Sequence, residues 1–79
     1  MNITDTNLSA LTEAINESPD GIIRRVEAAS ANHIRRCITA ELLERTSERV
    51  GRGYAWKLTA AGQTAVAEYT KFWTDWRNQ

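Results

Sequence analysis

The sequence predicts a small, mainly α-helical domain that carries one β-hairpin. Apolar side chains recur at intervals of three and four residues along most of the chain, which is typical of helices with one buried face. The pattern changes to alternation only within residues 48–59, beside two glycines, which indicates a hairpin. With 79 residues the chain allows a single domain with a thin core, since a chain of this size buries only about 60% of its unfolded surface. This length excludes dinucleotide-binding and barrel enzymes.

The first helix is expected over residues 5–17, with Thr4 or Asp5 as its N-cap. Its apolar face is formed by side chains three and four residues apart, namely Leu8, Leu11 and Ile15. Proline disfavours the helical conformation in the residue before it, so this helix is expected to end by about Glu17.

Two further helices are expected close together. Residues 18–28 begin with a suitable N-cap, Ser18, and a proline at the first helical position, and their apolar residues are Ile22, Ile23 and Val26. After Ser30, residues 31–43 place their apolar side chains on one face, namely Ile34, Cys37, Ile38 and Leu42. A short joint between two amphipathic helices is the helix-turn-helix arrangement.

The hairpin is expected to have Arg52 at or near its tip, because Gly51 and Gly53 flank this residue. The second strand is marked by alternating large side chains, namely Tyr54, Trp56 and Leu58. Thr59 then begins the last helix as its N-cap. One stripe of that helix runs to the end of the chain through Val66, Tyr69, Trp73 and Trp76.

Three stretches match a known pattern in the same order. They are His33-Ile34-Arg35-Arg36-Cys37-Ile38, Glu48-Arg49-Val50-Gly51-Arg52-Gly53, and Trp56-Lys57-Leu58-Thr59-Ala60-Ala61-Gly62. Residues 8–62 thereby resemble the winged helix-turn-helix domains of bacterial and phage transcriptional regulators, with these stretches as recognition helix, wing and strand-to-helix ending. Such domains usually have glycine and a branched apolar residue before the wing, where this chain has Arg45-Thr46-Ser47. The resemblance implies a winged helix-turn-helix domain over residues 1–62 and a C-terminal helix over 63–79 that packs on it or forms a dimer interface.

The resemblance also implies binding to double-stranded DNA, with helix 31–43 in the major groove and the wing, 48–58, on the backbone or minor groove. Arginine reads guanine and asparagine reads adenine, so Arg36 and Asn32 are the first candidates for base contacts. Arg52 can reach a narrow minor groove. The candidate DNA-binding residues are Asn32, His33, Arg35, Arg36, Thr39, Arg49, Arg52 and Lys57. A merely solvated polar face remains the alternative for each of them.

Aromatic residues are concentrated in the last helix, which holds four of the six in the chain. We expect a domain this small to leave part of that area uncovered, and exposed aromatic clusters mark interfaces. Trp73 is expected to close the core against the first helix, whereas Phe72 and Trp76 are expected at an interface. A homodimer formed there would pair two recognition helices about 34 Å apart on DNA. The candidate dimer or partner interface comprises Tyr69, Phe72, Trp73 and Trp76.

Charge is distributed unevenly although ten basic residues balance ten acidic ones. Residues 1–23 hold four acidic and no basic residues, whereas residues 24–57 hold eight basic and four acidic ones. An electropositive middle favours an anionic partner such as DNA. The zero net charge and acidic start equally suit an alternative, a non-enzymatic protein-binding winged helix such as a phage or mobile-element inhibitor or adaptor of a host protein complex.

Catalytic and metal-binding chemistry have little support in the sequence. Cys37 and His33 are the only residues of their kinds, so no internal disulfide forms and a metal site lacks ligands. We expect no enzyme activity, no cofactor and no bound metal. No apolar run approaches 18 residues and no signal peptide is evident, so a cytoplasmic protein is expected.

Overall fold

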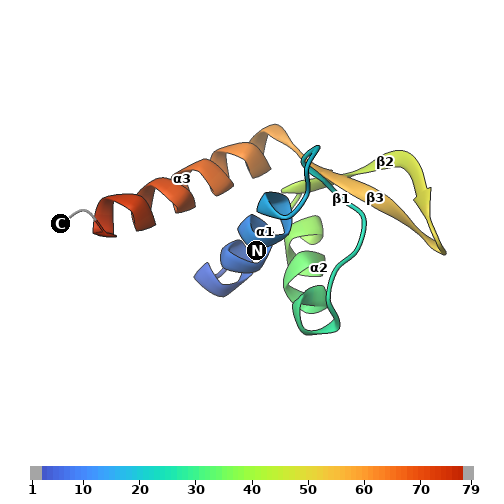
Figure 1. The fold of residues 1–79 in the computed structure, drawn as a ribbon, viewed down its shortest axis with the longest axis horizontal. Coiled ribbons are helices and arrows are strands. Elements are labelled where there is room, and N and C mark those ends of the chain that lie inside the picture. The colour runs from blue at the N-terminus through green and yellow to red at the C-terminus, as the bar shows by residue number, and fades with distance from the viewer. Residues whose placement is uncertain (1–2, 78–79) are drawn as a thin grey trace.

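Three α-helices and a three-stranded antiparallel sheet make up the fold in the computed structural model, which describes residues 3–77. The elements follow in the order α1 (Asp5–Asn16), β1 (Ile22–Ile23), the 3₁₀ turn η1 (Ala28–Ser30), α2 (Ala31–Thr39), β2 (Leu43–Val50), β3 (Gly53–Leu58) and α3 (Ala60–Arg77). β3 lies between β1 and β2 in the sheet. Helices with a small antiparallel sheet are therefore confirmed. Figure 1 shows the hairpin and α3 projecting from α1 and α2 in opposite directions.

α1 begins and ends close to the predicted residues. The Thr4 hydroxyl accepts a hydrogen bond from the Asn7 amide, and the Asn7 side-chain oxygen accepts one from the Thr4 amide, at 3.1 and 3.0 Å. This reciprocal capping box satisfies two of the amides that a helix start leaves free. Of the predicted apolar face, Leu11 is fully buried and the other two side chains are half-buried.

The predicted helix over residues 18–28 is wrong. The Gly21 amide instead donates to the Ser18 carbonyl at 3.1 Å, closing a tight turn in which Pro19 is the second residue. Gly21 has a φ of 73°, which interrupts a helix. The β-branched pair after it forms β1 along the free edge of β3, and Ile23 enters the core at 2% exposure. Within residues 3–77 a single α-helix therefore separates β1 from β2.

α2 ends at Thr39, four residues before the predicted end. Glu41 adopts the left-handed conformation with a φ of 64°. The Glu41 amide donates to the Ile38 carbonyl and the Leu42 amide to the Cys37 carbonyl, at 3.0 and 2.9 Å. These two bonds form a Schellman motif, which terminates a helix. β2 consequently begins earlier than the predicted hairpin, at Leu43.

The hairpin tip lies where the sequence predicts it. Val50 pairs with Gly53, leaving Gly51 and Arg52 as a two-residue turn. Gly51 has a φ of 58°, as the first position of a type II′ turn requires. Further down the hairpin three residues of β2, 46–48, oppose the single residue Ala55, which is a bulge that bends the strand.

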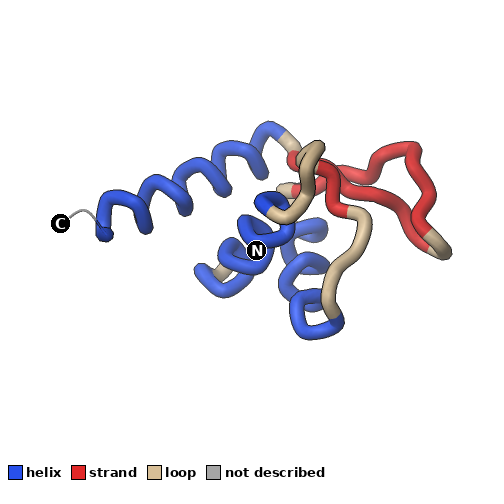
Figure 2. The backbone as a smooth tube through the Cα atoms, viewed as in Figure 1, coloured by secondary structure: helices blue, strands red, loops and turns tan. Residues whose placement is uncertain are grey.

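The core lies between α1, α2 and one face of the sheet (Figure 2). Its buried members are Leu11, Ile23, Ile34, Cys37, Leu42 and Leu43. Cys37 is fully buried, as expected for a small apolar residue, and burial raises the pKa of its thiol. α3 packs against this core through Ala65 and Val66, near its start. The predicted boundary after residue 62 falls inside α3, which is one continuous helix.

Candidate nucleic-acid interface

α2 turns one face to the core and the opposite face to solvent. Ile34 and Cys37 are buried. Four of the five candidate residues on this helix are exposed, namely Asn32, Arg35, Arg36 and Thr39. The Thr39 hydroxyl donates to the Arg35 carbonyl within the helix at 3.0 Å, so its hydrogen is already used. The exposed face therefore offers two guanidinium groups and one amide.

His33, the fifth candidate on this helix, is half-buried against α1. Its Nδ1 lies 2.8 Å from Nδ2 of Asn7, a side chain that is only 3% exposed. Because the Asn7 oxygen accepts from the Thr4 amide, the nitrogen of that amide group must be the donor to His33. His33 therefore accepts at Nδ1 and, as a neutral ring, carries its hydrogen on Nε2. This histidine connects α2 to the capped start of α1.

Two arginines are held on one face of the hairpin by an aromatic ring. Arg45 and Arg49 pair across the strands with Trp56 and Tyr54, so all four side chains lie on the same face of the sheet. The guanidinium carbons of Arg45 and Arg49 lie 4.4 and 5.1 Å from the centre of the Tyr54 ring. Cation–π contacts of this kind restrict where the guanidinium groups lie. From the sequence, Arg49 was singled out but Arg45 was not, because the register that brings Arg45 next to Tyr54 crosses a bulge that the sequence does not reveal.

The same hairpin face is turned towards α2. A groove of about 230 Å³ lies between them, lined by Ile34, Arg35 and Ile38 from α2 and by Tyr54 and Trp56 from β3, among others. Figure 1 shows the hairpin extending beyond α2 on this side. Of the arginines on α2 and the hairpin, Arg35 lines this groove. We give the name basic concave face to the set of five exposed arginines on these two elements, namely Arg35, Arg36, Arg45, Arg49 and Arg52.

The ion pairs involve other basic residues. Arg24, which also lines the groove, binds both Asp20, at 2.8 Å, and Glu48, at 2.5 Å. The Arg24 guanidinium lowers the pKa of Asp20 to about 2 and also lowers the pKa of Glu48. Lys57 pairs with Glu44 at 3.2 Å on the sheet face opposite Trp56, so the structure does not bring this candidate together with the others.

The five arginines of the basic concave face do not pair with carboxylates of the described residues. All are exposed, and none forms an ion pair with any residue in 3–77. Arg52 occupies the hairpin tip. Local charge on this face is therefore positive although the whole chain is neutral.

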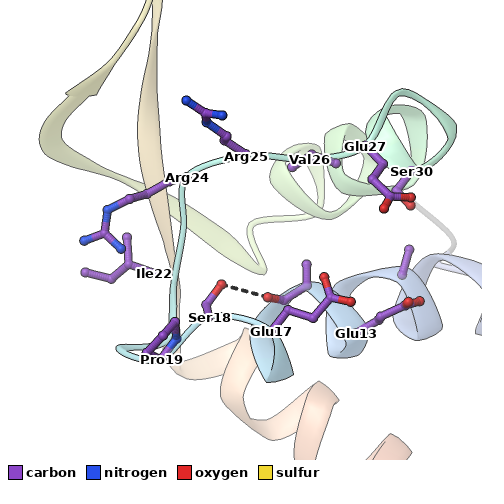
Figure 3. A pocket seen from close by; sticks show the side chains of 12 residues that line it. Glu13, Glu17, Ser18, Pro19, Ile22, Arg24, Arg25, Val26, Glu27 and Ser30 are labelled. Carbon is purple, nitrogen blue, oxygen red and sulfur yellow. Dashed lines mark hydrogen bonds between the residues drawn. The ribbon is translucent and has the colours of Figure 1, made fainter.

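A second groove, of about 420 Å³, lies between α1 and the segment after β1 (Figure 3). Most of the residues that line it opposite α1 fall within the segment 18–28, which the sequence predicted to be a helix. Its charged lining consists of Glu13 and Glu17 at the end of α1 and of Arg24, Arg25 and Glu27 on the other side, with the side chains of the two arginines pointing away from α1. Both signs of charge therefore line this groove.

The aromatic side chains of α3 are largely uncovered. Trp73 is 38% exposed, and Phe72 and Trp76 are about 60% exposed. The expectation that Trp73 closes the core is wrong, because its side chain is exposed and lies outside the core cluster. Its ring makes edge-on contacts with the other aromatic residues of α3.

Comparison with protein-family models, with curated proteins and with solved structures finds no match for this chain. No helix within residues 3–77 combines the length and apolar character that crossing a membrane requires. Among the same residues, no three His, Cys, Asp or Glu side chains are grouped so that they would hold a metal ion.

Proposed function

We propose that this protein binds double-stranded DNA through its basic concave face. The observation that supports this most is the separation of charge within a neutral chain. Carboxylates neutralise Arg24 and Lys57, whereas the arginines on α2 and the hairpin have no such partner. Unpaired arginines on one face are the electrostatic footprint expected of a protein that neutralises phosphates.

The order of elements supports a winged-helix interpretation of the fold. α2 takes the place of the recognition helix, and β2 and β3 take the place of the wing. β1 pairs with β3, so a strand and an extended segment stand where the helix before the recognition helix was predicted. In this interpretation the protein is a small prokaryotic or phage transcriptional regulator, as the resemblance of residues 8–62 implies.

α2 has nine residues and is about 13 Å long, so only a few of its side chains can reach base edges. Arg36 and Asn32 are the candidates for bidentate contacts to guanine and adenine. Arg45 and Arg49, positioned on Tyr54, and Arg52 at the tip are candidates for phosphates or the minor groove. A duplex lying in the concave face would contact both elements at once.

The test is a titration of labelled duplex DNA across a range of salt concentrations. The logarithm of the association constant should fall linearly with the logarithm of salt, by about 0.9 per phosphate contact. Arg36→Gln should weaken binding about tenfold on a preferred site, as loss of one bidentate base contact does. Arg49→Gln should weaken all sequences alike and lower the salt slope by about one.

Lys71→Gln is the matched control, because it removes one positive charge from an exposed position on α3, which projects away from the hairpin (Figure 1). It should change DNA affinity less than Arg36→Gln or Arg49→Gln. If wild-type protein shows no salt-dependent binding to duplex DNA, or if the double variant Arg36→Gln/Arg49→Gln binds as tightly as Lys71→Gln, the proposal fails. A stoichiometric protein partner found together with that result would support the protein-binding alternative instead.

A further inference from the structure

One side of α2 faces the hairpin rather than the core or open solvent. Spacings of three and four residues place four side chains on this side of the helix, namely Ala31, Ile34, Arg35 and Ile38. They line the groove of about 230 Å³ between α2 and β3, which we call the hairpin groove. Its other lining residues come from β1, from the segment after β1 and from β3, namely Ile23, Arg24, Val26, Tyr54 and Trp56. The candidates for base contacts on α2, Asn32 and Arg36, are not among them, so the hairpin groove is a separate feature of this helix.

The walls of the hairpin groove are mostly apolar. Five of its nine lining residues are aliphatic. Ile23 and Ile34 are buried, so the bottom of the groove is apolar. Tyr54 and Trp56 are half-buried and add aromatic surface, and each of these side chains carries one hydrogen-bond donor. Largely apolar walls with a few polar groups are typical of a site for a small molecule.

One of the two arginines that line the hairpin groove has a free charge. The Arg24 guanidinium is already paired with the carboxylates of Asp20 and Glu48. Arg35 is exposed and forms no ion pair with any residue in 3–77. A guanidinium donates two parallel hydrogen bonds to a carboxylate, and such charge-assisted bonds are stronger than bonds to a neutral acceptor. The charge of the groove therefore selects an anion, whereas its walls select an apolar body.

We propose that the hairpin groove binds a small carboxylic acid with an apolar body, whose carboxylate pairs with Arg35. Sites for drug-sized molecules have volumes of roughly 300–1,000 Å³, so the smaller volume of this groove limits the body to about one ring. A DNA phosphate can also pair with Arg35, but it has no apolar part that would cover Ile34 and Ile38. The acid satisfies both the charge and the walls.

The bound acid should weaken DNA binding, because Arg35 also belongs to the basic concave face. A carboxylate on Arg35 neutralises one of the charges that would otherwise meet phosphate. This consequence rests on the proposed DNA binding, whereas the ligand site itself does not. The two are therefore tested separately.

The site is tested by NMR titration of the isotope-labelled full chain with phenylacetate, in the absence of DNA. The dissociation constant should be about 1 mM, as expected for a probe of about ten non-hydrogen atoms. The signals that shift should be those of the lining residues, the indole N–H of Trp56 among them. Phenylacetamide has the same ring and chain without the charge, so it should bind about tenfold more weakly.

Three variants locate the bound probe. Arg35→Gln should weaken phenylacetate binding about tenfold but leave the weaker binding of phenylacetamide unchanged, since only the acid uses the charge. Ala31→Leu fills the groove from α2 and should abolish the binding of both probes. Lys71→Gln removes one positive charge from an exposed position on α3 and is the control, with a dissociation constant within about twofold of wild type. Circular dichroism establishes that each variant keeps its helices.

Three results would overturn the ligand site. They are the absence of saturable shifts at the lining residues, equal affinity for phenylacetate and phenylacetamide, and an Ala31→Leu protein that binds phenylacetate like wild type. Each of them would leave the DNA-binding proposal standing, because no DNA is present in these titrations.

A second titration, of labelled duplex DNA, tests the competition. Phenylacetate at about ten times its dissociation constant should weaken DNA binding about three- to tenfold, as mutual exclusion at one arginine requires. Sodium chloride at the same ionic strength is the control and should have a smaller effect. Unchanged DNA affinity under saturating phenylacetate would overturn the competition.

Discussion

Gly62 and Leu42 are in backbone contact that leaves no room for a side chain. A Cβ on Gly62 would lie 1.9 Å from the carbonyl oxygen of Leu42 and 2.9 Å from its carbonyl carbon. The same junction is tied by Thr59, whose hydroxyl donates to the Glu41 carbonyl at 2.6 Å and accepts from the Gly62 amide at 3.0 Å. These contacts hold the start of α3 against the end of α2. Because the hairpin lies between these two points in the chain, they also fix the position of its base.

Gly62→Ala is expected to destabilise the fold by about 2–4 kcal/mol, because backbone must move to admit the methyl group. Helix propensity alone would give the opposite sign, a gain of about 1 kcal/mol. Urea unfolding followed by circular dichroism measures the difference. Ala61→Gly, at the exposed neighbouring position, should cost only about 1 kcal/mol. An unfolding midpoint for Gly62→Ala at or above wild type would contradict the contact.

Glu41→Gly is expected to stabilise the protein by about 0.5–1 kcal/mol. Glu41 occupies the left-handed position of the Schellman motif, which glycine adopts without steric cost. Glu41→Ala removes the same charge but keeps the Cβ, so its stability should stay within about 0.5 kcal/mol of wild type. Thermal unfolding of the three proteins side by side decides this, and equal melting temperatures for the glycine and alanine variants would refute the assignment of strain.

The helix starts and the hairpin turn were predicted correctly, because each depends on residues that are close together in the sequence. Thr4 and Thr59 cap their helices as expected, and the two-residue turn at Arg52 follows from the glycine before it. Residues 18–28 were misassigned because their cap, proline and apolar spacing suit a helix, whereas the free edge of β3 offers the two isoleucines backbone hydrogen bonds and burial. That edge exists only in the folded sheet, so the local sequence around residues 22–23 cannot predict that they form a strand.

The candidate site was predicted less completely than the fold, for a similar reason. Exposed arginines on α2 follow from helical periodicity, but the register of β2 against β3 contains a bulge that no sequence rule places. Arg45 was therefore not recognised as a neighbour of Tyr54. The acidic partners of Arg24 and Lys57 come from other strands and turns, so the separation of paired from unpaired basic residues also required the structure.

Protonation of Asp20 at low pH should remove the stabilising ion pair between its carboxylate and Arg24. Its pKa is lowered from the ordinary 3.8 to about 2, chiefly by hydrogen bonds from Arg24. A carboxyl whose pKa is depressed by folding contributes stability above its unfolded pKa, and that contribution is lost as pH falls from about 4 towards 2. Arg24→Gln should return the Asp20 pKa towards 3.8. Carboxyl chemical shifts followed by NMR between pH 2 and 6 measure this, and a wild-type Asp20 that titrates near 3.8 would refute the ion pair.

His33→Ala is expected to cost about 1–3 kcal/mol of stability, because the buried Asn7 amide loses its acceptor. Asn32→Ala, at the exposed neighbouring position on the same helix, should change stability by no more than about 0.5 kcal/mol. Urea unfolding of the two variants separates these outcomes. Equal stability of both variants would show that His33 is a surface residue like its neighbour and would restore it to the candidates for direct DNA contact.

Tyr54 should affect DNA binding without touching DNA, because its ring positions Arg45 and Arg49. Tyr54→Ala removes both cation–π contacts, each worth about 0.5–1 kcal/mol, and should weaken DNA binding roughly three- to tenfold. Tyr54→Phe keeps the aromatic face and should bind within about twofold of wild type. The salt slope should stay the same in all three proteins, since the number of cationic groups that meet phosphate is unchanged. Fluorescence anisotropy titrations at three salt concentrations test this, and a Tyr54→Ala protein that binds like Tyr54→Phe would show that the ring does not position the arginines for DNA.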